Sequence, residues 1–67
     1  MESEFLHVPK DLKRFVIGRG GNTLQGIIQR SGASVSAGSR DVEGFTIAGD
    51  EKQRACAKRL ILEIVVS

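Results

Sequence analysis

A cluster of glycines in the first half of the chain limits what its neighbours can fold into. Three of the four residues in Gly18-Arg19-Gly20-Gly21 are glycine. Each glycine inside a helix costs roughly 1 kcal/mol relative to alanine, so a helix is not expected to run through this segment. Glycines also let a backbone turn sharply and approach another molecule closely. The cluster therefore predicts a tight connection between two separate elements.

Apolar residues on both sides of the glycine cluster repeat at intervals of three and four, which indicates two helices. The pattern predicts a first helix over Lys10–Val16 that Pro9 begins, because proline suits the first turn of a helix. A second helix is expected to start with Asn22 or Thr23 as its N-cap and to end at Ser31-Gly32.

Alternation between apolar and polar side chains predicts three short strands. The first runs from Phe5 and stops at Pro9, the second covers Ala33–Ala37 and the third covers Phe45–Ala48. The segment Gly38–Gly44 has the composition of a loop, so we expect the last two strands to pair antiparallel.

A third helix is expected to follow the last strand. Asp50 and Gln53 have the spacing of a capping box, in which each side chain accepts a hydrogen bond from the other residue's backbone N–H. An apolar stripe at helical spacing then follows, formed by Ala57, Leu60, Ile61 and Ile64. The resulting order is strand, helix, helix, strand, strand, helix, which is an α+β fold without an internal repeat. Gly26 in the second helix predicts close backbone packing.

Charge is distributed unevenly, although the formal net charge is only +2. Residues 10–40 carry six basic side chains and one acidic side chain, whereas residues 1–9 carry a net −2 and residues 41–67 a net −1. A basic half of this kind favours a polyanionic partner, and a solvated basic face is the alternative.

The glycine cluster combines several features that suit a phosphate group. The second helix begins directly after it, so N–H groups without intrahelical partners face the loop, and Arg19 adds a positive charge. A dinucleotide-binding fingerprint does not fit, because Thr23 stands where the third glycine would be and the preceding segment is predicted as helix. A P-loop would need a Lys-Ser or Lys-Thr pair, and the apolar residues 24–28 do not suit the recognition helix of a helix-turn-helix.

Length and composition argue against an enzyme and against a bound metal. A chain of 67 residues buries only about 60% of its unfolded surface, so an enclosed catalytic cavity would consume its core. The single cysteine, Cys56, excludes an internal disulfide and a multi-cysteine zinc site, and His7 has no second ligand at a suitable spacing. No pair of carboxylates is placed for acid–base catalysis. We expect no catalytic residues, no metal and no cofactor.

The chain also lacks the marks of a membrane or secreted protein. No apolar run approaches the roughly 20 residues that span a bilayer, and the acidic N-terminus differs from a signal peptide. The sequence predicts an intracellular protein, cytoplasmic or nuclear. We expect residues 1–67 to form one domain, with a core over about residues 5–65, excised from a longer protein.

Several segments together resemble a type I K-homology (KH) domain, with similarity to the repeats of vigilin-like multi-KH proteins. They are Val8-Pro9, the run from Phe15 to Gly21, Leu24-x-x-Ile27 and Ser31-Gly32-Ala33-Ser34-Val35. The resemblance spans Phe5 to Val65. It implies a three-stranded antiparallel sheet with three helices packed on one face.

The resemblance also implies a function, which is to bind single-stranded nucleic acid, most readily RNA, without catalysis. A GXXG loop of this family clamps the backbone of about four nucleotides, and neighbouring KH domains and a role in post-transcriptional regulation would accompany it. The residues implied for the nucleic-acid backbone are Gly18, Arg19, Gly20, Gly21 and Asn22. Those implied for the base groove are Arg14, Ile17, Leu24, Ile27, Ile28, Val35 and Ala37. Lys13, Arg30 and Arg40 are further candidates for phosphate contact.

Some positions depart from the family pattern. Ile28 stands where arginine is frequent, Ala37 where a bulky aliphatic residue is frequent, and Arg14 where glycine is frequent. The three phenylalanines fit core positions, so aromatic stacking of bases is not expected. These departures keep a second hypothesis open, namely a KH-like module for protein contact or dimerisation that binds nucleic acid weakly or not at all.

Overall fold

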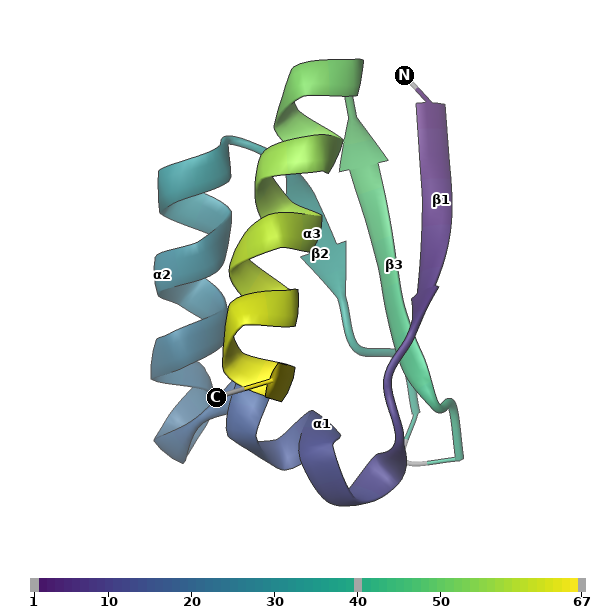
Figure 1. Ribbon diagram of the computed structural model, residues 1–67, viewed down its shortest axis with the longest axis vertical. Coiled ribbons are helices and arrows are strands. Elements are labelled where there is room, and N and C mark those ends of the chain that lie inside the picture. Colours follow the sequence, from purple (N-terminus) through teal and green to yellow (C-terminus); the bar gives the residue numbers. More distant parts are fainter. Residues whose placement is uncertain (1, 40, 67) are drawn as a thin grey trace.

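The structure is a computed structural model of the chain, and it describes residues 2–39 and 41–66. Its elements follow the expected order (Figure 1). They are β1 (Glu2–His7), α1 (Lys10–Ile17), the short 3-10 turn η1 (Arg19–Gly21), α2 (Asn22–Ser31), β2 (Ser34–Ser36), β3 (Gly44–Gly49) and α3 (Glu51–Val66).

The three strands form one antiparallel sheet in the order β1-β3-β2. All three helices lie on one face of this sheet, with α3 crossing it and α2 beside α3 (Figure 1). Ile47 in the middle of β3 pairs with Glu4 on one side and with Val35 on the other. The expected α+β architecture is therefore confirmed.

The first strand differs from its expected bounds, because it begins at Glu2 and ends at His7 rather than Pro9. Its polar N-terminal residues carry no apolar alternation. They join the strand because β1 pairs with β3 along its whole length, from Glu2 opposite Gly49 to His7 opposite Gly44.

The core lies between the sheet and the helices. Its fully buried members come from every layer, with Phe45 and Ile47 from β3, Val16 from α1 and Ile61 from α3. The stripe expected on α3 is confirmed, since Ala57 and Ile61 are fully buried and the other two members pack against the core.

Only one of the three phenylalanines is in the core, so the expectation for the other two was wrong. Phe5 is 54% exposed and Phe15 is 58% exposed. Phe5 pairs with the exposed Thr46, while its neighbours Glu4 and Leu6 are partly buried, so its side chain lies on the face of the sheet that the helices do not cover.

The starts of α2 and α3 are built differently. At α3 the capping box is confirmed, because Asp50 N–H donates to Gln53 Oε1 over 3.0 Å and Gln53 N–H donates to Asp50 Oδ1 over 2.8 Å. At α2 the expected cap is wrong, because Gly21 occupies the N-cap position and no side chain caps the helix.

Two further glycine predictions have different outcomes. Gly32 ends α2 in the left-handed conformation, with its N–H donating to Ile28 O over 2.9 Å, as expected for a helix C-terminus. The close packing expected at Gly26 is absent, because a Cβ placed there would meet no atom within 4 Å.

Candidate nucleic-acid interface

The glycine cluster forms a left-handed turn between α1 and α2. Gly18, Gly20 and Gly21 have φ angles of 75°, 62° and 81°, which residues with side chains rarely adopt. A Cβ on Gly18 would overlap Thr23 Oγ1 and lie 2.7 Å from Thr23 Cβ, whereas a Cβ on Gly20 or Gly21 would meet nothing within 4 Å. The first glycine is therefore required by close packing as well as by φ, and the other two are required by φ.

The turn uses only part of its hydrogen-bonding groups within the chain. Gly18 N–H donates to Arg14 O over 2.8 Å and closes α1, Gly21 N–H donates to Gly18 O over 3.3 Å, and Asn22 N–H donates to Arg19 O. Arg19 and Gly20, between them, are both exposed. The exposed backbone of the turn thus leads directly into the N-terminal end of α2, where the helix dipole is positive.

Exposed basic side chains on α1, the turn and α2 have no acidic partners among residues 2–39 and 41–66. Lys10, Arg14, Arg19 and Arg30 are exposed and form no ion pair there. The Arg14 guanidinium lies 5.4 Å from the centre of the Phe15 ring. This side of the molecule therefore presents positive charge that is available to an anion.

Among the described residues, three of the four basic side chains on α3 are instead paired with carboxylates, and Lys52 is the exception. Arg54 donates to Glu4 over 3.0 Å and to Glu2 over 2.8 Å, and Lys58 donates to Glu4 over 3.1 Å. The hydrogen bond from Lys58, together with the nearby positive charges, lowers the pKa of Glu4 below its ordinary value of 4.5. Arg59 pairs with Glu63 over 3.4 Å. Among the described residues, the positive charge without a paired carboxylate therefore lies mainly on α1, the turn and α2.

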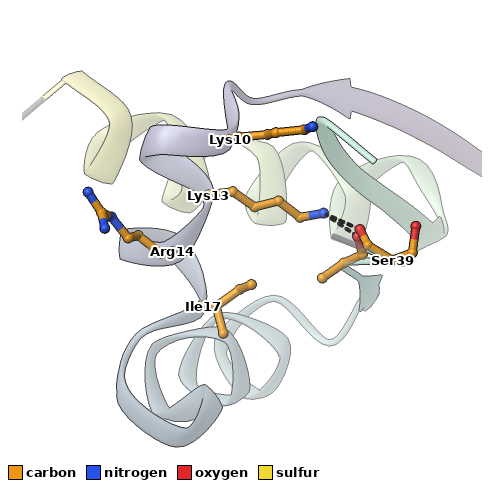
Figure 2. A pocket seen from close by; sticks show the side chains of 7 residues that line it. Lys10, Lys13, Arg14, Ile17 and Ser39 are labelled. Atoms are coloured by element: carbon orange, nitrogen blue, oxygen red, sulfur yellow. Dashed lines mark hydrogen bonds between the residues drawn. The ribbon is translucent and has the colours of Figure 1, made fainter. Parts of the chain in front are cut away.

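A groove of about 300 Å³ lies beside the turn, between α1 and the segment that follows β2 (Figure 2). It is lined by Lys10, Lys13, Arg14, Ile17, Ala37, Gly38 and Ser39. It brings together three residues expected in the base groove, namely Arg14, Ile17 and Ala37. Most of its accessible wall is apolar, and its cations lie on the α1 side.

Lys13 is held within the protein, which the sequence did not indicate. It is only 7% exposed, and its ammonium donates to the backbone carbonyls of Ala37, Ser39 and Val42. An ammonium has three N–H groups, so all of them are occupied by carbonyls. Lys13 in this conformation has no donor left for the phosphate contact that was expected of it.

Other expected groove residues lie elsewhere. Ile27 is 4% exposed and Val35 is 8% exposed, so both belong mainly to the core, and Leu24 and Ile28 are partly buried against it. Ile27 also lines a second hollow, of about 390 Å³, between α2 and α3. Asn22 and Arg30 line that hollow too, while Arg40 lies outside the described residues.

Three lining residues were missed by the sequence analysis, namely Lys10, Gly38 and Ser39. Lys10 could have been found, because it precedes Arg14 by four residues and Ile17 by seven, and these spacings share one helix face. Gly38 and Ser39 gave no signal beyond loop composition.

The described residues contain neither of two other kinds of feature, a membrane span and a metal-binding cluster. Among residues 2–39 and 41–66, no helix is both long enough and apolar enough to cross a membrane. The same residues contain no group of three or more His, Cys, Asp or Glu side chains arranged to hold a metal ion.

The fold is that of a type I KH domain, and the sequence matches the KH domain family over residues 3–63. The chain belongs to the KH domain family. It is 40% identical, over 94% of its length, to the human Tudor and KH domain-containing protein. It spans only 12% of that relative.

Solved structures agree with this assignment. The first type I KH domain of human vigilin superposes with a TM-score of 0.88 at 25% identity, over 97% of this chain and 71% of that one. A chain in the a/eIF2alpha-aDim2p-rRNA complex of Pyrococcus horikoshii superposes with a TM-score of 0.79 at 22% identity. That match covers 96% of this chain and 38% of the other, and it supports the fold alone.

Proposed function

We propose that this domain binds single-stranded nucleic acid, most readily RNA, with about four nucleotides held at the glycine turn. The observation that carries the proposal is the open start of α2. Three left-handed glycines lead into a helix without a side-chain cap, next to an exposed Arg19 that has no acidic partner in the described part of the chain. Membership of the KH family supports RNA binding in general.

The phosphates are assigned to the turn itself. Backbone N–H groups of Arg19 and Gly20, the positive end of α2 and the Arg19 guanidinium would all face the same anion. Gly20 and Gly21 have open space around them, so a phosphate can approach the backbone closely.

The bases are assigned to the groove between α1 and the segment after β2. Ile17 and Ala37 supply apolar contact there, and Arg14 lies at its edge (Figure 2). Because the side chain of Ala37 is small, the groove is wide at this position. A wide groove would accept several different bases rather than select one. Ile27 and Val35 contribute mainly by supporting this wall from the core.

The small footprint predicts weak binding by one copy of the domain. If two or three phosphates are neutralised, the logarithm of the binding constant falls with the logarithm of salt concentration with a slope of about −1.4 to −2.1. Useful affinity would then come from further domains joined in one chain, because linkage raises the effective concentration. The relatives in which this domain fills 12% of the length have room for such domains.

A titration tests the proposal. Binding of a labelled, randomised single-stranded RNA pool is measured at low salt for the wild type and for an Arg19→Asp, Gly20→Asp double variant. The control is Lys52→Gln, Arg59→Asp, which lowers the formal charge by the same three units at exposed positions of α3. Aspartate tolerates the left-handed conformation of Gly20 better than most residues, so the test variant should remain folded.

The expected result is that the wild type and the control bind the pool while the double variant does not. Equal binding by the double variant, or no binding by the wild type, would refute the proposal. Concentration-dependent sedimentation without RNA would then support a module for protein contact.

A further inference from the structure

We propose that Lys13 is a positioning residue, whose buried ammonium holds the loop between β2 and β3 against α1 and so sets one wall of the groove. The loop-holding role stands on contacts within the chain. Its effect on RNA rests on the proposed function.

The geometry around the ammonium is that of a filled cation site. Three carbonyl oxygens, from Ala37, Ser39 and Val42, accept hydrogen bonds from Nζ, with a distance of 3.3 Å to Ser39 O. They come from a segment 24 to 29 residues away in the sequence. Figure 2 shows the Lys13 side chain extended from α1 toward Ser39.

The charge of Lys13 is compensated by dipoles rather than by a carboxylate. Among residues 2–39 and 41–66 it forms no ion pair, and its Nζ lies 5.6 Å from the centre of the buried Phe45 ring. Burying an ammonium is unfavourable unless its N–H groups are hydrogen-bonded. The conformation therefore requires the three carbonyls to stay where they are, which constrains the loop.

The loop itself offers little to fix its shape. In its described part, one internal backbone hydrogen bond is present, from Val42 N–H to Ser39 O over 3.1 Å. Gly38 has a φ of 67°, which only glycine adopts freely. Lys13 supplies three hydrogen bonds to the same segment, so it is the main polar tie between the loop and α1.

Lys13 also joins the two sides of the groove. Lys10, Arg14 and Ile17 line it from α1, and Ala37, Gly38 and Ser39 line it from the loop. A side chain that starts on the first wall and binds the second sets their separation. Loss of this tie would widen or loosen the groove without removing any group that contacts RNA.

The test uses Lys13→Met, which keeps the length of the side chain and removes its donors. Lys10→Met is the matched control for loop order, because Lys10 lies on the same helix and lines the same groove, yet is exposed and forms no ion pair among the described residues. Fast backbone motion of Gly38, Ser39 and Val42 is measured by ¹⁵N relaxation, and RNA affinity is measured over a range of salt concentrations.

The expected result is that the loop amides become less ordered in Lys13→Met and not in Lys10→Met. RNA affinity falls by about fivefold in Lys13→Met because a preset groove wall is lost, and the salt slope stays unchanged. Unchanged loop order would overturn the proposal. A slope that becomes shallower by about 0.7 would also overturn it, since Lys13 would then contact a phosphate directly.

A measurement on the wild type keeps the proposal testable if Lys13→Met does not fold. The ammonium protons of Lys13 should exchange with water slowly enough to give an NMR signal, whereas those of the exposed Lys10 and Lys52 should not. Equally fast exchange at Lys13 and Lys10 would refute the proposal that Lys13 holds the loop. Failure of the wild type to bind RNA would refute the proposed function instead, and leaves the loop measurements to decide the role of Lys13.

Discussion

Helix α3 begins with its N-terminal groups occupied by side chains, whereas helix α2 begins without any side-chain cap. At α3, Asp50 and Gln53 bond to each other's backbone, and Arg54 binds Gly49 O over 3.1 Å. At α2, the N-cap is Gly21 in the left-handed conformation, preceded by exposed backbone. The same short chain thus closes one helix start with its own groups and leaves another open.

The charged side chains also differ between the surroundings of α2 and those of α3. The carboxylates of Glu2 and Glu4 bind Arg54 and Lys58 on α3, while Arg19 just before α2 and Arg14 on α1 have no such partner among the described residues. A capped helix start with paired charges stabilises the fold. An uncapped start with unpaired cations leaves donors and positive charge for a ligand, and we therefore propose that the interface lies at the start of α2.

The largest effect, on the stability of the domain, is expected at Gly18, the first glycine of the turn before α2. Gly18→Ala should destabilise the domain by about 3 kcal/mol, because left-handed strain is added to a clash with Thr23. Gly20→Ala should cost only about 1 kcal/mol, since its Cβ meets open space. Urea unfolding of both variants measures the difference, and equal losses would show that packing against Thr23 is unimportant.

A smaller effect, on RNA affinity, is expected from neutralising one cation beside the start of α2, and no effect from neutralising one cation on α3. Arg19→Gln should weaken RNA binding by about tenfold, the size of one lost charge-assisted hydrogen bond, and should make the salt slope shallower by about 0.7. Arg59→Gln, on α3, should change neither quantity. The comparison between the two sides fails if both variants lose the same affinity in parallel titrations.

The caps provide a third comparison. Asp50→Ala should lower the stability of the domain by about 1 kcal/mol, because it removes an N-cap hydrogen bond. Asn22→Ala should change stability by less than about 0.5 kcal/mol, because no side chain caps α2. Thermal and urea unfolding check both values, and a large loss at Asn22 would mean that α2 is capped after all.

The smallest effect concerns pH. The folded-state pKa of Glu4 is lowered below 4.5, so its ion pairs add stability above that pH, and this contribution is lost as pH falls through the folded pKa. Glu4→Gln should therefore be less stable than the wild type at neutral pH, and the difference should shrink as the pH falls below 4.5. A constant difference between the two proteins across this range would contradict the role of the Glu4 ion pairs.

Local sequence patterns predicted the order of elements, the antiparallel pairing and the capping box at Asp50, because each depends on residues a few positions apart. Features that depend on distant partners were missed. Glu2 is in a strand only because Gly49 pairs with it, and Phe5 is exposed because of the face that β1 presents. The carbonyls that bind Lys13 lie more than 20 residues away, and no pattern in α1 indicates them.

For the same reason, the sequence predicted the glycine turn of the candidate site better than it predicted the groove. The glycine turn is a contiguous motif, so its residues could be named from the sequence. The groove is assembled from two separate segments, and Ile17 and Ala37, two of the residues that the resemblance implied, line it. It also suggested Ile27 and Val35, which packing places mainly in the core.

The central claim is that the open start of α2 holds the nucleic-acid backbone, and an NMR titration tests it most directly. The ¹⁵N-labelled domain is titrated with short single-stranded RNA, and backbone amide shifts are followed at both helix starts. The account predicts the largest shifts at Arg19, Gly20 and Gly21, and almost none at Asp50 and Gln53. Shifts that cluster at the start of α3, or that are absent at the glycine turn while RNA binds, would contradict it.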